Sequence, residues 1–273
     1  MSYVDLHLHS LHSDGSDTPS HIVERAVEAG AAAIALTDHD TTAGVAEGRA
    51  AAAAAGIGFL SGTEISTHYK FREIHVLGLG VDENNDPLTT ALEGLCASRR
   101  NRGNIILERL RALGFDLNIE ADAAHAPEGA FGRMHIARAM TDAGHVRKPQ
   151  EAFDRFMNAG GPAYVPKETM PLADAVDLIH GAGGLAFVAH PGLGKTTRKL
   201  LPELLAFSFD GIEAYHVSHS PGRVEEFIAL ARERGLLITG GSDCHGTIKG
   251  KALLGSVRTP VPVYEAILDA LSR

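Results

Sequence analysis

The sequence has few of the features that mark secreted, membrane or disulfide-linked proteins. Its 273 residues include no tryptophan, only two cysteines and no apolar run near the length of about 20 residues that a membrane-spanning helix needs. Cys96 and Cys244 lie far apart and outside any CxxC pair, which argues against a disulfide framework and a structural zinc site. Because the first ten positions carry charged and polar residues, we expect no secretion, no membrane partner and a cytoplasmic location.

Positive charge is also scarce. The formal net charge is −9 and the isoelectric point is near 5.9, so the surface offers no basic footprint for long nucleic acid. The charge is uneven, however, because residues 99–167 hold eleven Lys and Arg against eight Asp and Glu, a net +3 that leaves −12 for the rest. This segment is predicted to bind an anion locally, although most of its arginines individually fit solvated helix faces.

Apolar runs typical of strands alternate with helical stretches. The expected strands are 4–8, 33–36, 58–60, 73–79, 185–189, 211–215 and 238–240. The expected helices are 19–29, 42–55, 172–181, 200–206, 223–234 and 263–271. Repeated βα units predict a parallel sheet, and this many indicate an α/β barrel.

The alternation lapses between residues 98 and 167. Segments 101–113 and 134–143 are predicted to be helical, with Gly160-Gly161-Pro162 as a break after them. We therefore expect a discontinuous barrel, residues 1–98 and 168–273, and a small, mostly helical insertion, residues 99–167, that caps the barrel mouth.

Histidines and carboxylates gather in short motifs that nearly all follow strands, where barrel enzymes build their sites. The motifs are HLH at 7–9, HSDG at 12–15, TDHD at 37–40, GTE at 62–64, IHVLG at 74–78, AHPG at 189–192 and GSDCH at 241–245. His7 and His9 are two apart in a strand and point to the same face. Singly, Asp14 fits a turn, Asp38 a helix cap and Glu64 an ion pair. Together they predict one polynuclear site with Mn²⁺, Fe²⁺ or Zn²⁺, from which Cys244 points away.

These motifs resemble those of the PHP (polymerase and histidinol phosphatase) family in the amidohydrolase superfamily. DLHLHS at 5–10, TDHD at 37–40, AHPG at 189–192 and GSDCH at 241–245 stand in the family's order, and the likeness covers the chain except the insertion. The resemblance implies a distorted (β/α)₇ barrel that holds two or three divalent metal ions, for which we expect Mn²⁺. It also implies three ligand sets: His7, His9, Glu64 and Asp243 for one ion, His75 and His190 with bridging Glu64 for a second, and Asp14, His39 and His245 for a third.

The charge of such a site suits a phosphate ester. Three divalent ions bring about six positive charges and their carboxylates three negative ones, which leaves positive charge for a hydroxide and a phosphate dianion. The metals would lower the pKa of a bridging water that attacks phosphorus and would stabilise the charge that develops. The leaving alkoxide needs a proton, and His216, His219 or a metal-bound water are the candidates for this catalytic role.

The insertion is expected to select the substrate. Arg133 and His135 lie at the start of a predicted helix, where a guanidinium and backbone N–H groups hold phosphate well, and Lys167 lies where the chain re-enters the barrel rim. Arg99 and Arg100, with Arg102, cluster at a predicted helix start, where like charges favour a bound anion.

GRMHIAR at 132–138 and AYVPK at 163–167 are similar to the PHP branch that removes the 3′-phosphate from nucleoside 3′,5′-bisphosphates such as pAp. Related members trim short 5′-phosphorylated oligoribonucleotides. We expect a small nucleotide or short RNA as substrate, and base stacking would depend on few aromatics, such as Phe131, Tyr164 or Tyr215.

Two alternatives stay open. One is a different substrate in the same site, such as histidinol phosphate, or a C–N bond, which an acidic cap would favour. The other is a non-enzymatic role, since PHP modules also occur as accessory parts of DNA polymerases. The intact set of predicted ligands favours the enzyme.

Overall fold

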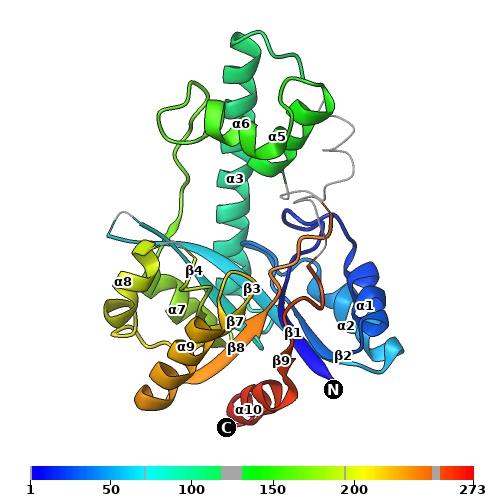
Figure 1. Ribbon diagram of the computed structural model, residues 1–273, viewed down its shortest axis with the longest axis vertical. Helices are drawn as coiled ribbons and strands as arrows, with labels where there is room; N and C mark the ends of the chain where they lie inside the picture. Colours follow the sequence, from blue (N-terminus) through cyan, green and yellow to red (C-terminus); the bar gives the residue numbers. More distant parts are fainter. Residues whose placement is uncertain (1, 71, 118–130, 194, 248–252) are drawn as a thin grey trace.

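The computed structural model describes residues 2–70, 72–117, 131–193, 195–247 and 253–273. These residues form a barrel with a helical extension that rises from one end (Figure 1). Among the described helices, none is both long enough and apolar enough to cross a membrane.

Seven strands of the described chain make up the barrel. They are β1 (Tyr3–Leu8), β2 (Ala31–Leu36), β3 (Gly58–Tyr69), β4 (Arg72–Leu79), β6 (Leu185–Val188), β7 (Gly211–His216) and β8 (Leu237–Gly241). They are hydrogen-bonded in the order β8-β7-β6-β4-β3-β2-β1. The ring nearly closes because the Asp243 N–H donates to the His7 carbonyl at 3.0 Å, just beyond β8. The expected distorted (β/α)₇ barrel is confirmed.

The distortion comes from β4. This strand is antiparallel to both β3 and β6, whereas the remaining neighbours among the seven are parallel. β3 ends at Tyr69 and β4 begins at Arg72, which leaves no room for the crossover helix that parallel neighbours need. The prediction of an all-parallel sheet is therefore wrong at this strand. His75 lies inside β4, opposite Ser66 of β3, and Glu64 lies in the middle of the long strand β3.

Helices pack against the barrel wall. They are α1 (Pro19–Glu28), α2 (Val45–Ala55), α7 (Leu172–Gly181), α8 (Lys195–Leu204), α9 (Pro221–Arg234) and α10 (Val261–Leu271). Their apolar residues are buried against the strands, as when Val176 and Ile179 of α7 pack with Val188 and Ile212. Two short strands, β5 (Met170–Pro171) and β9 (Thr259–Pro260), extend the sheet beside β3 and β1.

One long helix links the barrel to the cap. α3 (Asp86–Ala112) starts where the Asn85 side chain accepts a hydrogen bond from the Leu88 N–H at 3.1 Å. Its first half packs on the barrel through Leu88 and Leu92, and its second half joins a separate core through Ile106 and Leu110. The predicted helix 101–113 is therefore only the second half of α3, and the predicted boundary at residue 99 falls inside it.

The rest of the cap consists of α5 (Arg133–Asp142), α6 (Pro149–Ala152) and the π-helical turn η1 (Phe153–Met157). These elements lie against the upper part of α3 in Figure 1. Ile136, Met140, Phe156 and Met157 are buried with the upper part of α3. The cap thus has its own hydrophobic core, and α3 fixes where that core stands above the barrel.

Candidate metal centre and cap pocket

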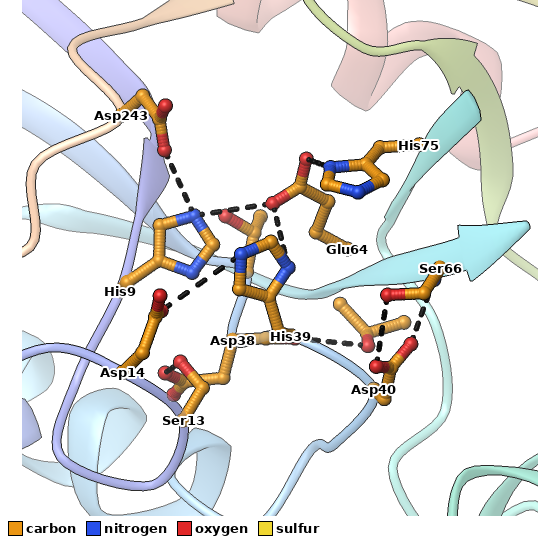
Figure 2. Close-up of polar contacts among 12 residues, drawn as sticks. His9, Ser13, Asp14, Asp38, His39, Asp40, Glu64, Ser66, His75 and Asp243 are labelled. Atoms are coloured by element: carbon orange, nitrogen blue, oxygen red, sulfur yellow. Dashed lines mark hydrogen bonds and ion pairs between the residues drawn. The ribbon is translucent and has the colours of Figure 1, made fainter. Parts of the chain in front are cut away.

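One buried carboxylate lies among the imidazoles predicted as metal ligands. Glu64 Oε1 is 2.7 Å from His75 Nδ1 and 2.8 Å from His190 Nε2. Its other oxygen, Oε2, lies within 3.3 Å of three more ring nitrogens, those of His7, His9 and His39. Figure 2 shows Glu64 between His9, His39 and His75. Segments far apart in the sequence therefore meet at this one side chain.

The predicted ligands form overlapping groups of donor atoms. Within each of three groups the donor atoms lie no more than 4.8 Å apart: His7, His9, Glu64 and Asp243; His9, Asp14, His39 and His245; and His39, Glu64 and His75. The ninth predicted ligand, His190, joins them through its contact with Glu64. The fold thus brings all nine predicted ligands together. Cys244 does not join them, because it packs with Leu8 and Ile22 in an apolar cluster.

The spacing of these atoms fits metal binding. His7 Nε2 and His9 Nε2 are 3.0 Å apart, and His9 Nε2 is 3.1 Å from Asp243 Oδ1. Four donors that each lie about 2.1 Å from one tetrahedral ion are separated by about 3.4 Å. Two ring nitrogens aimed at one point, with carboxylate oxygens around it, therefore suit a shared cation.

The electrostatics of the group also favour positive charge. Burial alone would lower the pKa of His9, but Asp243 and Glu64 outweigh this and raise it to about 9. Burial would raise the pKa of Glu64, but His39 and the other imidazoles hold it well below its usual range. The surroundings of Glu64 thus favour its negative form, and a divalent ion would supply the positive charge that this carboxylate attracts.

Backbone strain gathers at the same place. Of the four described non-glycine residues with positive φ, three are Asp40 (56°), His190 (28°) and Asp243 (52°). His190 and Asp243 follow the ends of β6 and β8 by two residues, and Asp40 follows the end of β2 by four. Such conformations cost about 1–3 kcal/mol each and persist where the surroundings enforce them, as at functional sites.

Two buried carboxylates that support the centre were not predicted. Glu213 on β7 accepts a hydrogen bond from His7 Nδ1 at 2.8 Å and another from the His190 N–H at 2.5 Å. Asp38 accepts from the Ser10 N–H at 2.7 Å and from Ser13 Oγ at 2.6 Å, which fastens the loop that carries Asp14 (Figure 2). A carboxylate inside an apolar strand, as in Gly211–His216, is the signal that would have found Glu213.

The two histidines predicted as catalytic occupy different settings. His216 Nδ1 accepts from the Ser218 N–H at 3.1 Å, and its Nε2 faces Asp243 Oδ2 at 3.5 Å. Both ring nitrogens of His219 contact backbone, because Nδ1 donates to the Ala214 carbonyl at 2.8 Å and Nε2 accepts from the Gly192 N–H at 3.0 Å. His219 therefore joins two loops, and its contacts do not support proton transfer to a substrate.

A pocket of about 230 Å³ lies between the metal centre and the cap. Its floor includes Asp14, His39 and His75, and four cations face it: Arg99, Arg102, Arg133 and Lys167. Burial first, and then the neighbouring Arg133, lower the pKa of Arg102 to about 10. Crowded guanidinium groups of this kind are relieved when an anion binds between them.

Two of these cations are held by carboxylates of the barrel. Arg99 forms an ion pair with Asp40, which also accepts from the Ser66 N–H at 2.7 Å (Figure 2 shows Asp40 and Ser66). Lys167 pairs with Glu73 and donates to Ser66 Oγ at 2.8 Å. Glu73 in turn accepts from His75 Nε2 at 2.9 Å. The cap side of the pocket is thereby tied to a candidate metal ligand.

Two of the predicted substrate residues, Arg100 and His135, lie outside the lining of this pocket. Arg99, Arg100 and Arg102 lie in the middle of α3, so the prediction that they begin a helix is wrong. Arg99 and Arg102 share the helix face that lines the pocket, whereas Arg100 is exposed and outside the lining. His135 is buried in α5, where its Nδ1 accepts from the Gly132 N–H at 3.3 Å. It caps the helix that positions Arg133.

Comparison with known proteins agrees with this geometry. The PHP domain matches residues 5–121, and the 3′,5′-nucleoside bisphosphate phosphatase of Chromobacterium violaceum is 36% identical over 98% of this chain and 95% of its own. The chain belongs to the PHP domain family. The 5′-3′ exoribonuclease of Haemophilus influenzae is 35% identical over 96% of this chain and 97% of its own.

A solved structure extends the likeness to the whole fold. A Bifidobacterium adolescentis protein described as a metal-dependent phosphoesterase matches with a TM-score of 0.88 and 31% identity, covering 98% of this chain and 96% of its own. The protein is thus a PHP enzyme, a metal-dependent phosphoric ester hydrolase, as the sequence motifs predicted. The alternative of a non-enzymatic PHP module is not supported.

Proposed function

We propose that the protein removes the 3′-phosphate of nucleoside 3′,5′-bisphosphates, as in pAp to AMP. The same bond is the first phosphodiester of a short 5′-phosphorylated oligoribonucleotide, which we propose as a further substrate. The observation that carries this proposal is that one pocket is lined both by candidate metal ligands and by Arg102 and Arg133. A substrate with two phosphates is complementary to these two kinds of group, and the names of the relatives agree with it.

The metal centre would hold the phosphate that is cleaved. We assign the nine candidates as ligands: His7, His9, Asp14, His39, Glu64, His75, His190, Asp243 and His245. Divalent ions, with Mn²⁺ expected and Fe²⁺ or Zn²⁺ as alternatives, supply when bound an activated water and positive charge for the phosphoryl oxygens. Glu213 orients His7, and His216 faces Asp243, so both act as positioning residues. A direct role of His216 as proton donor stays a prediction.

The cap would hold the second, uncleaved phosphate. Arg133 is the first residue of α5, and it lines the pocket together with Gly132 and Met134, so its side chain and the start of the helix both face the bound anion. Arg102 reaches the pocket while its Nε donates to the Val165 carbonyl at 2.8 Å, which fixes its position. Lys167 would exchange Glu73 for phosphate when substrate enters.

Steady-state kinetics on matched substrates tests the proposal. The Mn²⁺-loaded enzyme should release phosphate from pAp with a higher kcat/KM than from 3′-AMP, which lacks the second phosphate. Arg133→Ala should remove this preference, whereas Arg138→Ala should keep it, because Arg138 lies on the same helix and pairs with Asp142 at the surface. A wild-type enzyme that releases no phosphate from pAp would contradict the proposed function.

A further inference from the structure

A second cation-lined pocket lies where the loop after β6 meets α8 and α9. This pocket, called here the α8–α9 pocket, has a volume of about 710 Å³ and is bounded by Gly192 and by side chains of α8 and α9. The charged residues of its lining are Arg198, Lys199, Arg223 and Glu226. Three cations against one carboxylate leave a positive excess in a protein whose net charge is −9.

The pocket is close to the metal centre. Gly192 follows the candidate ligand His190 by two residues, and its N–H donates to His219, whose ring centroid is 5.2 Å from that of His216. A Cβ atom at Gly192 would lie 2.5 Å from His219 Cδ2, so only glycine fits between the loop and this ring. α8 and α9 follow β6 and β7, and both begin at the end of the barrel that carries the metal centre.

The guanidinium groups are held at the rim by one shared partner. Glu226 lies 3.0 Å from Arg198 and 3.2 Å from Arg223, which joins α8 to α9. Lys199 is exposed beside them. Exposed ion pairs of this kind contribute little to stability, so the arginines remain able to bind phosphate while their side chains are already ordered.

Exposed apolar side chains accompany these charges. Leu193 is 52% exposed and directly follows Gly192, and Val217 is 43% exposed in the loop between β7 and α9. They are two of the five large apolar side chains that are most exposed in the described chain, and both stand in loops of the metal-bearing end. Cations together with apolar contacts are what a single nucleic-acid strand needs for its backbone and its bases.

Resting on the proposed function, we propose that the α8–α9 pocket binds the part of a short oligoribonucleotide that lies 3′ of the cleaved bond. The 5′ nucleotide occupies the cap pocket and the cleaved phosphate lies at the metal centre, so the following nucleotides must leave along another side. The α8–α9 pocket offers cations on that path for the phosphates that each added nucleotide brings. pAp ends at the cleaved phosphate and does not reach it.

The test compares chain lengths in two variants with equal loss of charge. Arg198→Ala/Lys199→Ala removes pocket cations, and Arg232→Ala/Arg234→Ala removes two exposed arginines from the last turn of α9. We expect the pocket variant to lower kcat/KM on a 5′-phosphorylated RNA trinucleotide about fivefold, and to leave kcat/KM on pAp unchanged. The control variant should match the wild type on both substrates.

A binding measurement without hydrolysis supplies an independent readout. In excess chelator, the fluorescence anisotropy of a 3′-labelled trinucleotide should show weaker binding to the pocket variant. The slope of the logarithm of the binding constant against the logarithm of the salt concentration should be shallower by about 0.7 for each lost phosphate contact. If kcat/KM of the pocket variant falls equally on pAp and on the trinucleotide, or falls on neither, the α8–α9 pocket is not an RNA site. Failure of the wild type to cleave pAp is a separate result and would overturn the proposed function instead.

Discussion

The metal centre and the cap pocket share a boundary but are built differently. The metal centre consists of buried and half-buried side chains from strands and the loops that follow them, and two of its candidate ligands, His190 and Asp243, have positive φ. The cap pocket takes its cations from helices and from the returning loop, and two of them are paired with carboxylates. We propose that the barrel determines where the chemistry occurs, whereas the cap selects which phosphate ester is accepted.

We expect the largest effect when the carboxylate of Glu64, which contacts imidazoles from several strands, is removed. Glu64→Gln keeps the size of the side chain but removes the charge that faces five imidazoles. We expect kcat/KM on both pAp and p-nitrophenyl phosphate to fall about a thousandfold. Circular dichroism and thermal melting should show a folded protein. Retained activity on either substrate would mean that the cap, not this centre, carries the chemistry.

A smaller effect is expected for the carboxylate behind the ligands. Glu213→Gln weakens the hydrogen bond that orients His7. Loss of such a partner typically lowers metal affinity or activity about 10- to 100-fold. The Mn²⁺ concentration for half-maximal activity should rise, and saturating Mn²⁺ should restore most of kcat. If kcat alone falls and the Mn²⁺ dependence is unchanged, Glu213 does not act through the metal ligands.

Arg133→Ala tests the cap pocket without touching the metal centre. The lost phosphate contact should lower kcat/KM on pAp about tenfold, while activity on p-nitrophenyl phosphate, which has one phosphate, stays within about twofold of the wild type. Phosphate release assays measure both. An equal fall on the two substrates would place Arg133 among the residues that support the metal centre.

Arg99 is expected to matter for stability, since its charge is committed to Asp40. Removing one partner of a buried ion pair commonly costs about 3–5 kcal/mol, so Arg99→Ala should unfold at a clearly lower denaturant concentration. Arg100→Ala, one residue along the same helix but exposed, should change neither melting nor activity. A comparable loss in Arg100→Ala would contradict the assignment of these two helix faces.

Short motifs predicted the candidate ligands because their spacing is local. DLHLHS places His7 and His9 on one face of β1 whatever surrounds it, and all nine candidates came from such motifs, although Glu64 and His75 lie inside β3 and β4. The antiparallel direction of β4 could not be predicted in this way, because His75 fits a parallel strand equally well. What decides the direction is the short connection from Tyr69 to Arg72.

The rotational position of residues on α3 explains why the sequence did not predict which arginines face the cap pocket. The predicted helix began at residue 101, so the prediction did not include the Asn85 cap and assigned three arginines to a helix terminus. Once the helix runs from Asp86, Arg99 and Arg102 fall on the pocket face and Arg100 on another. Glu213 and Asp38 were missed for a different reason, since their partners are distant in sequence and only the closed barrel brings them together.

The unbroken helix α3 also makes the enzyme sensitive to the length of one segment. A rise of about 1.5 Å per residue gives its 27 residues a length of about 40 Å. Each residue turns the helix by about 100°. A single insertion between Leu92 and Ile106 would therefore rotate the cap relative to the barrel and move Arg133 and Lys167 away from the metal centre. Substitutions on the exposed face of α3 should therefore be tolerated far better than insertions or deletions within it.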